Sequence, residues 1–406
     1  IRGAQRNQRM TSDWIIETRS MSRMMSIILL LYPMACQGPN ETAEQQETLS
    51  LTDMLSGVDT VGYSRALEAR TFNFPEDHGP HESFRTEWWY VTGNLNSEDG
   101  DPFGFQFTIF RNSLSPSRSN GTSAWNTNQA YMGHFALTDI NENDFFFEEK
   151  FSRGAVGLAG AETNPLRIWI EDWFLEGSTQ DKNVFPLRLS GGADGIQLDL
   201  TLQEGKPVVL QGEEGLSKKG NAPGNASYYF ANTRMPASGT LLVNGELLEV
   251  SGLAWMDREW STSALSDGQV GWDWFALHLD DGWDLMVYQL RRADGSADPL
   301  SAASLIDPSG RKTTLQLGSD ILIQPNDYWN SSLGDAQYPS GWNIKVPSQD
   351  WDLLVEPAVD DQELLVTFRY WEGSVRVSGT GKNGARMNGR GYAELTGYAG
   401  DALPNQ

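Results

Sequence analysis

A segment near the middle of the chain, rich in tryptophan and acid, holds residue types that could do chemistry. From Trp255 to Trp274 there are four tryptophans and four carboxylates. On a strand, Trp255, Asp257 and Glu259 would share one face, because strand side chains alternate. If that face lines the interior of a barrel, desolvation raises the pKa values of both carboxyls and makes them proton donors. The faces of the tryptophans could then stabilise a cation.

A structural role for the same carboxylates is the competing interpretation. Asp257 and Glu259 could instead form ion pairs with Arg258, Arg234 or Arg85 at a junction between domains. The sequence leaves both interpretations open. The candidate catalytic residues are Asp257 and Glu259. The candidates for ligand binding are Trp88, Tyr90, His134, Tyr228, Arg234, Trp255, Trp272 and Trp274.

Other kinds of chemistry find little support in the sequence. His78, His81, Glu82 and Glu87 lie close together, but their spacing fits neither a helical zinc motif nor a compact ligand set. We therefore expect local hydrogen bonds there and no metal. The sequence has no Gly-x-Ser-x-Gly elbow and no glycine-rich phosphate loop before a helix, so no cofactor is expected. A net charge of −24, spread along the chain, argues against nucleic acid as a partner.

Two similar tryptophan-rich patterns, at residues 86–95 and 271–279, predict the elements that position these side chains. Each pattern is followed by a turn that ends in Asp-Gly. An alternating strand that ends in arginine comes next. Such patterns are typical of β-hairpins with one buried face. Their duplication predicts an all-β protein with two tandem antiparallel β-barrel domains, over residues 72–262 and 263–403.

The N-terminal part of the chain predicts export. The stretch from residue 21 to Cys36 has a short cationic start, an apolar run and a small residue before the only cysteine. Residues 1–36 are therefore predicted to be a lipoprotein signal, with Cys36 lipidated and inserted in a membrane. An ordinary signal peptide with a chance cysteine is the alternative. Residues 37–71 are predicted to be a polar linker. We expect a periplasmic or outer-membrane lipoprotein of a bacterium.

Several longer motifs resemble a known family. They are the segments 85–90, 228–234, 252–260, 271–275 and 391–398. Over about residues 75–400 the chain resembles the AttH-type lipocalin-like proteins, which are related to carotenoid 1,2-hydratase (hydroxyneurosporene synthase). The resemblance implies two lipocalin-like β-barrel domains. In the hydratases an acid protonates a terminal isoprenoid double bond, and water captures the cation. Asp257 matches that acid, whereas Tyr228 or Tyr229 stands where the hydratases carry a histidine.

These observations predict an exported lipocalin-like protein that binds an apolar small molecule, such as an isoprenoid or a lipid, in an aromatic cavity. Two alternatives belong to other functional classes. One is an enzyme that hydrates or isomerises a polyene, with Asp257 as the acid. The other is a structural envelope protein without a ligand. The sequence does not indicate an oligomeric state.

Overall fold

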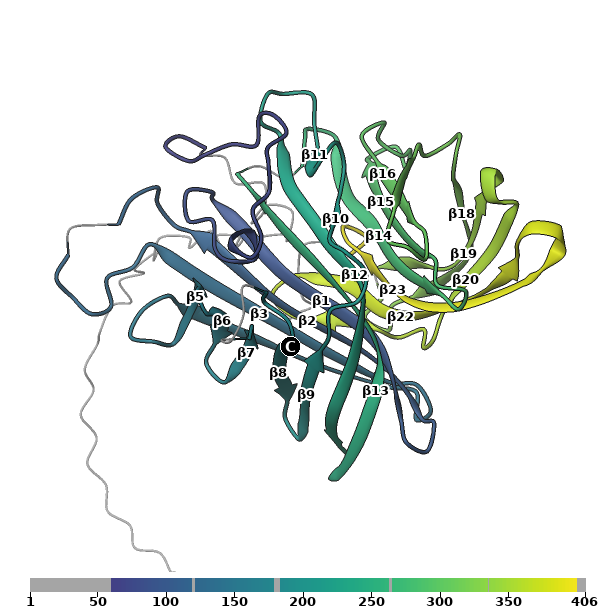
Figure 1. Ribbon diagram of the computed structural model, residues 1–406, viewed down its shortest axis with the longest axis horizontal. Coiled ribbons are helices and arrows are strands. Elements are labelled where there is room, and N and C mark those ends of the chain that lie inside the picture. The colour runs from purple at the N-terminus through teal and green to yellow at the C-terminus, as the bar shows by residue number, and fades with distance from the viewer. Residues whose placement is uncertain (1–59, 119–120, 179–182, 263–264, 335, 400–406) are drawn as a thin grey trace, which may run out of the picture. The chain divides into compact units, whose positions relative to one another are not determined.

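The computed structural model describes residues 60–118, 121–178, 183–262, 265–334 and 336–399, which all lie within one compact unit. Their regular structure consists of β-strands and three short 3-10 helices, η1 (Glu76–His78), η2 (Pro347–Gln349) and η3 (Lys382–Gly384) (Figure 1). The strands form two sheets, and every pairing between named strands is antiparallel. The predicted signal segment with Cys36, and the linker up to residue 59, lie outside the described residues.

The first sheet has thirteen strands and curves into a nearly closed barrel. Its main path runs β4-β3-β2-β1-β13-β12-β9-β8-β7-β6-β5, and β4 also contacts β6 and β8 across the barrel. The strands are β1 (Thr86–Ser97), β2 (Pro102–Ser113), β3 (Gln129–Asp139), β4 (Asp144–Arg153), β5 (Ala159–Thr163), β6 (Leu166–Ile170), β7 (Trp173–Glu176), β8 (Leu187–Ala193), β9 (Ile196–Leu202), β10 (Val209–Leu210), β11 (Leu216–Lys218), β12 (Ala226–Val243) and β13 (Glu246–Ser261).

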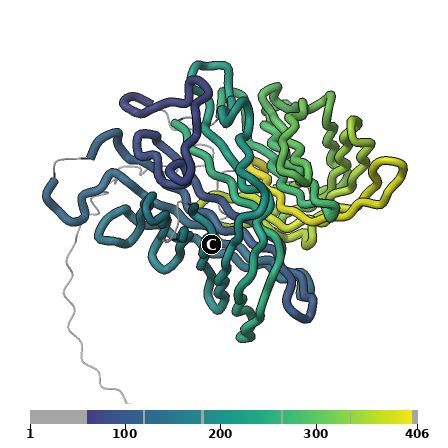
Figure 2. The backbone as a smooth tube through the Cα atoms, viewed as in Figure 1, coloured from purple at the N-terminus to yellow at the C-terminus, as the bar shows by residue number. Residues whose placement is uncertain are grey.

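The second sheet has ten strands, in the order β17-β16-β15-β14-β23-β22-β20-β19-β18, with β21 beside β22. It forms a half-barrel, and Figure 2 follows the chain through it into the C-terminal hairpins. The strands are β14 (Gln269–Leu279), β15 (Asp284–Arg292), β16 (Ala302–Ile306), β17 (Lys312–Leu315), β18 (Leu322–Asn330), β19 (Gln337–Val346), β20 (Trp351–Pro357), β21 (Glu363–Leu365), β22 (Arg369–Thr380) and β23 (Arg386–Leu395). The prediction of an all-β protein with two tandem antiparallel units is therefore confirmed.

The duplicated hairpin occupies the same place in both sheets. β1 pairs with the next strand, β2, and with the last strand of the first sheet, β13. β14 likewise pairs with the next strand, β15, and with the last strand, β23. The repeated sequence pattern thus produces a repeated topology, in which each tryptophan-rich strand lies near the middle of its sheet.

One face of each sheet forms the core of that sheet, and the opposite face packs against the other sheet. Trp89 and Val91 of β1 belong to the core inside the first barrel, and Phe275 and Leu277 of β14 belong to the core of the second sheet. The alternate residues form a third cluster, which includes Tyr90, Trp255, Trp274, Tyr288 and Tyr392. Contacts between β1 and β23 and between β2 and β22 join the two sheets.

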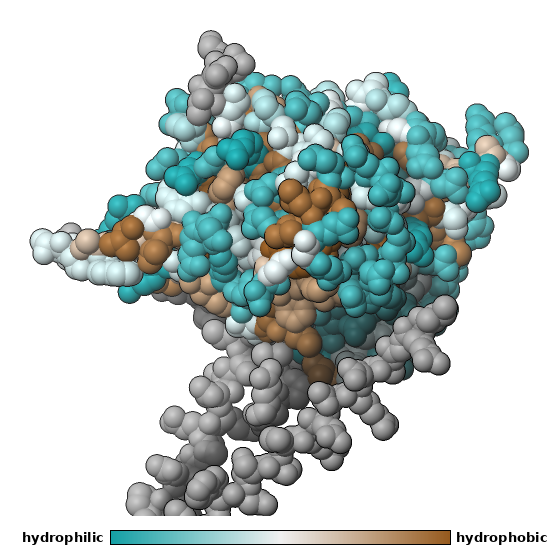
Figure 3. Space-filling model, turned by 90° about the horizontal axis from the view of Figure 1, so that it is seen from below, coloured by the Kyte–Doolittle hydropathy of each residue, from teal (hydrophilic) through white to brown (hydrophobic). Residues whose placement is uncertain are grey.

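The surface suits a strongly acidic protein. The face shown in Figure 3 is mainly hydrophilic, with hydrophobic side chains gathered in several patches. The net charge of the whole chain is −24. Among the described residues, none belongs to a helix with the length and apolar character needed to cross a bilayer.

Candidate active site

The predicted acids lie in a pocket between the two sheets. In the register of the first sheet, Tyr90 of β1 is opposite Asp257 of β13, and Trp88 is opposite Glu259. Tyr229 of β12 is also opposite Glu259. Because residues opposite each other in a sheet share a face, these five side chains point to the same side. That side faces the second sheet, so the acids line a pocket between the sheets and not the interior of a barrel, which was the condition considered from the sequence.

The pocket is built by both sheets and is rich in aromatic residues. Its cavity volume is about 60 Å³, which is enough for several water molecules. Trp88, Trp272, Glu394 and Leu265 are only partly buried and form its rim. The residues lining it are Trp88, Tyr90, Phe110, Lys219, Tyr229, Asp257, Glu259, Ser261, Leu265, Trp272, Trp274, Tyr288 and Glu394.

Asp257 is a buried acid held by two aromatic donors. The hydroxyl of Tyr229 donates to Oδ2 at 2.6 Å, and Trp255 Nε1 donates to Oδ1 at 2.7 Å. Burial raises the pKa of Asp257 to about 7, and these two hydrogen bonds offset only part of that effect. Trp274 Nε1 donates in turn to the Tyr229 hydroxyl at 3.3 Å. Asp257 can therefore hold a proton near neutral pH and release it beside the pocket.

Glu259 has a different environment, although it lies only two residues from Asp257. Lys219 Nζ, just after β11, is 2.9 Å from Glu259 Oε1, and the Ser227 hydroxyl donates to the same oxygen. Lys219 is itself buried, and its ammonium lies 3.9 Å from the centre of the Tyr288 ring. Burial lowers the pKa of Lys219, but Glu259 and Tyr288 together raise it above its usual value. Glu259 therefore has a cationic partner within the described residues, whereas the partners of Asp257 are two neutral aromatic donors.

The structure also decides the competing interpretation of these acids. Among the residues that the structure describes, Asp257 has no cationic partner, and the partner of Glu259 is a lysine rather than an arginine. Arg258 pairs with Glu87 on the opposite face of β13. The expected ion pairs of the two acids with Arg258, Arg234 or Arg85 are therefore not formed.

Indole and phenol rings surround the two acids. Trp274 packs edge-on against Tyr90, with ring centres 5.1 Å apart, and against Trp255 at 6.3 Å. Trp88 and Trp272 pack at one edge of the pocket against the small cluster of Phe110, Met132 and Phe368. The faces of such rings attract cations, so the aromatic lining can help to stabilise positive charge in the pocket.

Two of the predicted ligand-binding residues, Tyr228 and Trp255, do not line the pocket. Tyr228 lies on the opposite face of β12, where it packs near Trp260 and donates to the carbonyl oxygen of Glu68 at 3.0 Å. Its neighbour Tyr229 takes the pocket position, because successive strand side chains alternate. Trp255 is on the correct face but lies behind the lining, where it holds Asp257.

His134 and Arg234 bind the two sheets together rather than lining the pocket. The ring of His134 is fully buried and hydrogen-bonds Tyr370 of the second sheet at 2.7 Å and Glu149 at 3.0 Å. Arg234 pairs with Asp284 of β15 at 2.7 Å. A register shift in β12 between residues 232 and 235 turns Arg234 toward this buried aspartate. Both residues were predicted to contact a ligand. In the structure they instead connect the two sheets.

Sequence reasoning did not select several of the lining residues. Tyr229 could have been found by extending the alternation of β13 to β12, since both strands belong to one motif. Glu394 lies in the motif of residues 391–398, but nothing in the sequence places β23 opposite β13. Lys219 lies in an irregular segment, and no sequence pattern around it indicates a site residue. The remaining lining residues that were not selected are Phe110, Ser261, Leu265 and Tyr288.

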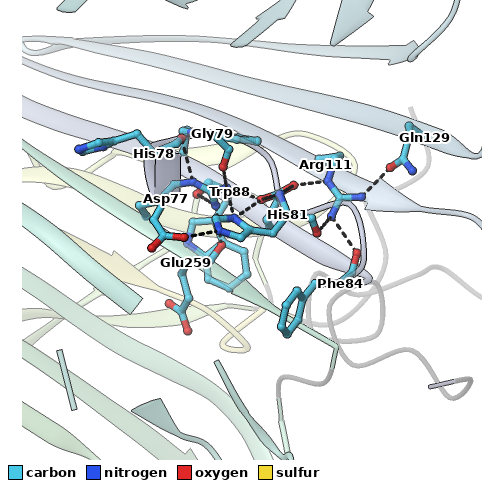
Figure 4. Close-up of polar contacts among 12 residues, drawn as sticks. Asp77, His78, Gly79, His81, Phe84, Trp88, Arg111, Gln129 and Glu259 are labelled. Carbon is cyan, nitrogen blue, oxygen red and sulfur yellow. Dashed lines mark hydrogen bonds and ion pairs between the residues drawn. The ribbon is translucent and has the colours of Figure 1, made fainter. Parts of the chain in front are cut away.

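A buried ion network on the other face of the first sheet contacts the histidine-rich segment before β1. Glu87 pairs with Arg111 and Arg258, and all three side chains are fully buried. Arg111 Nη1 also donates a hydrogen bond to Gln129 Oε1 at 2.6 Å (Figure 4). Arg258 donates to the carbonyl oxygen of Trp88 at 3.3 Å, so the network fixes the backbone at the edge of the pocket.

The histidines take part in this network without forming a metal site. The His81 ring stacks on Trp260 with ring centres 3.7 Å apart and lies 3.0 Å from Asp77 Oδ1. Burial lowers the pKa of His78 to about 3, so this side chain is neutral. Within the described parts of the chain, no group of three or more His, Cys, Asp or Glu side chains is placed to bind a metal ion.

Comparison with known proteins supports the resemblance seen in the motifs. The AttH-like family profile matches residues 65–398. The crystal structure of an AttH protein from Nitrosomonas europaea is 34% identical, with a TM-score of 0.72, and the match covers 83% of this chain and 100% of that one.

More distant relatives include enzymes that add or remove water. Dehydratase asqC of Emericella nidulans is 22% identical over 196 residues, and the match covers 46% of this chain and 53% of the dehydratase, about half of its length. Kievitone hydratase of Fusarium solani subsp. phaseoli is 21% identical over 256 residues, which is 59% of this chain and 68% of the hydratase.

A solved kievitone hydratase shares the fold. The enzyme from Nectria haematococca is 16% identical, with a TM-score of 0.62, and the match covers 84% of this chain and 97% of that one. At this identity the likeness shows the fold alone. The profile match over most of the chain and the Nitrosomonas structure together show the family: the chain belongs to the AttH-like proteins.

Proposed function

We propose that the protein is a hydro-lyase that adds water to, or removes it from, an unsaturated small molecule bound between the two sheets. The observation that carries this proposal is Asp257, a protonatable carboxyl buried against a pocket of aromatic rings. General acids work best when their pKa lies near the working pH, and that of Asp257 is about 7. The hydratase and dehydratase names of two relatives support the same class of reaction.

The reaction can be written with Asp257 as the only group that gains or loses a proton. In the direction of hydration, the proton of Asp257 passes to one carbon of the double bond, and the π electrons form the new C–H bond. A cation remains on the other carbon. The oxygen of a water molecule binds to that carbon, and the released proton returns to the carboxylate of Asp257. Dehydration is the reverse sequence.

The neighbouring groups have distinct roles in this scheme. The carboxylate of Glu259, which pairs with Lys219, lines the pocket where the cation would form and lowers the energy of that cation. Trp274 and Tyr90 add the attraction of their ring faces. The Tyr229 hydroxyl, 2.6 Å from Asp257, orients the acid. A protein that only carried an apolar ligand would have no use for a protonated acid in the pocket.

The first prediction concerns the pH dependence of the rate. Asp257 must be protonated to act, and its pKa is about 7. We therefore expect kcat for hydration of 2-isopropenylnaphthalene, a simple alkene that forms a tertiary cation, to fall about tenfold per pH unit above pH 7. The tertiary alcohol is measured by chromatography against a reaction without protein. A rate that stays constant from pH 6 to 9 would exclude Asp257 as the acid.

We also propose that the protein is exported and anchored through Cys36. This proposal rests on the sequence of residues 21–36. In a bacterial host, radioactive palmitate is expected to label the full chain but not a Cys36→Ala variant. Equal labelling of the two proteins would refute the anchor and would leave the proposed reaction unaffected.

A further inference from the structure

The second sheet contributes an acid that the proposed reaction does not use. Glu394 of β23 lines the pocket, across from Asp257 and Glu259 of β13. Trp272 Nε1 donates to its Oε2 at 3.0 Å. The other oxygen, Oε1, has no hydrogen-bond partner among the described residues and is therefore available to a ligand.

The surroundings of Glu394 favour its neutral form. Burial raises its pKa to about 7, and the negative charge of Glu259 acts in the same direction. Glu372, opposite Glu394 in the β22–β23 register, has a pKa raised well above its usual range by burial. Lys219, the cation in the lining, is paired with Glu259. The titratable and charged groups around Glu394 are Tyr90, Lys219, Tyr229, Asp257, Glu259, Tyr288, Tyr370, Glu372 and Tyr392.

The pocket contains a second polar group without a partner. Ser261 is 1% exposed and lines the same pocket, and its hydroxyl makes no hydrogen bond to the described residues. A hydrocarbon ligand would leave the buried hydroxyl of Ser261 and the Oε1 of Glu394 without a hydrogen-bond partner from the ligand. Sites built with polar donors reject ligands that lack the matching acceptor.

We infer that the ligand of this pocket carries a carbonyl or hydroxyl oxygen, which accepts a hydrogen bond from the protonated carboxyl of Glu394. The unsaturated part of the same molecule then lies against Asp257 on the opposite wall. This inference rests on the proposed function and narrows its substrate class to unsaturated compounds that also carry oxygen. It replaces the purely apolar isoprenoid or lipid expected from the sequence.

Two probes of nearly equal shape test the inference. 2-Acetylnaphthalene and 2-isopropenylnaphthalene differ by an oxygen in place of a CH₂ group. Their binding is measured by quenching of tryptophan fluorescence in Asp257→Asn protein, which should not consume the alkene. At pH 6 we expect the ketone to bind about tenfold more tightly, because neutral Glu394 donates to it. At pH 9 ionised Glu394 cannot donate, and the preference should fall below about threefold.

Variants of Glu394 separate hydrogen bonding from packing. Glu394→Met should abolish the preference at pH 6 and leave the affinity for the alkene within about threefold, because Met fills similar space without a donor. Glu394→Gln should keep the preference at both pH values, because its amide donates and does not titrate. A residue that only shaped the pocket would change the binding of both probes alike.

Three outcomes would overturn the inference: no binding of the ketone, equal affinities of the two probes at pH 6, or a preference that persists in Glu394→Met. The pH comparison in the Asp257→Asn protein leaves Glu394 unchanged, so it remains decisive if the Glu394→Met variant does not fold. The experiment measures equilibrium binding in a protein that should be unable to catalyse hydration. Its failure can therefore be distinguished from failure of the proposed reaction, which is tested by turnover.

Discussion

Replacing Asp257 with Asn is expected to lower the rate of hydration of 2-isopropenylnaphthalene by about 10²–10⁴-fold, the usual contribution of a general acid. The amide has nearly the same shape as the carboxyl and can still accept a hydrogen bond from Trp255 or Tyr229. It cannot supply a proton to the double bond. Affinity for the ligand should therefore change little while turnover is lost.

The same substitution should make the folded protein more stable above pH 7. Burial raises the pKa of Asp257 to about 7, so between about pH 4 and 7 the folded chain holds a proton that the unfolded chain has lost. The free energy of unfolding therefore falls as the pH rises through this window and stays low above it. The difference between the unfolded pKa of about 4 and the folded pKa of about 7 corresponds to at most about 4 kcal/mol. We expect Asn to recover about 1–3 kcal/mol of this at pH 8.

Asp273 provides a matched control. It is as buried as Asp257, and burial raises its pKa to about 6, but it lies on the opposite face of β14, with Arg291 at 3.0 Å. Asp273→Asn should keep turnover within about threefold of the parent, because Asp273 does not line the pocket. If Asp257→Asn retained turnover, or if both variants lost it equally, Asp257 would not be the acid.

The elements of the site could be predicted because their signals are local. The alternation that places Trp255, Asp257 and Glu259 on one face depends only on neighbouring residues, and it is correct. The repeat between β1 and β14 also follows from short patterns with their turns. These signals are sufficient for the fold class and for one wall of the pocket.

The sequence could not predict whether this wall faces the interior of the barrel or the second sheet. Both faces of β12 and β13 carry large aromatic residues, Tyr228 and Trp260 on one side and Tyr229 and Trp255 on the other. Hydrophobic pattern therefore cannot distinguish the barrel core from the contact with the second sheet. Glu394 reaches the pocket only through the packing of the two sheets, which no periodicity encodes.

Polar residues on strands were the least predictable part of the site. His134 and Arg234 appeared suited to ligand binding because each is a polar residue in an apolar strand. Their partners, Tyr370 and Asp284, lie in the second sheet. A buried polar side chain needs a partner, but the sequence does not say whether protein or ligand provides it.

Replacing Glu87 with Gln is expected to cause the largest loss of stability. Glu87 is the carboxylate that pairs with both Arg111 and Arg258, and all three side chains are fully buried. The variant would leave two guanidinium charges in the interior without a carboxylate. Breaking one buried ion pair in this way typically costs about 3–5 kcal/mol, so we expect a loss of at least about 4 kcal/mol in urea unfolding at pH 7. Activity should also fall, because Arg258 holds the backbone of Trp88.

The pH dependence and two further variants test the cause of that loss. Despite burial, the two arginines hold the pKa of Glu87 well below its usual range. Its stabilising effect is therefore complete above the unfolded pKa of about 4.5 and is lost as the pH falls toward the folded value, so the difference between parent and variant should shrink in acid. Removing the exposed pair by Asp352→Asn, where Lys345 lies 2.9 Å away, should cost less than about 1 kcal/mol. Adding Arg258→Met to Glu87→Gln should restore part of the loss, because one unpaired charge disappears. If the double variant is less stable than Glu87→Gln alone, the energetic effect comes from packing and not from uncompensated charge.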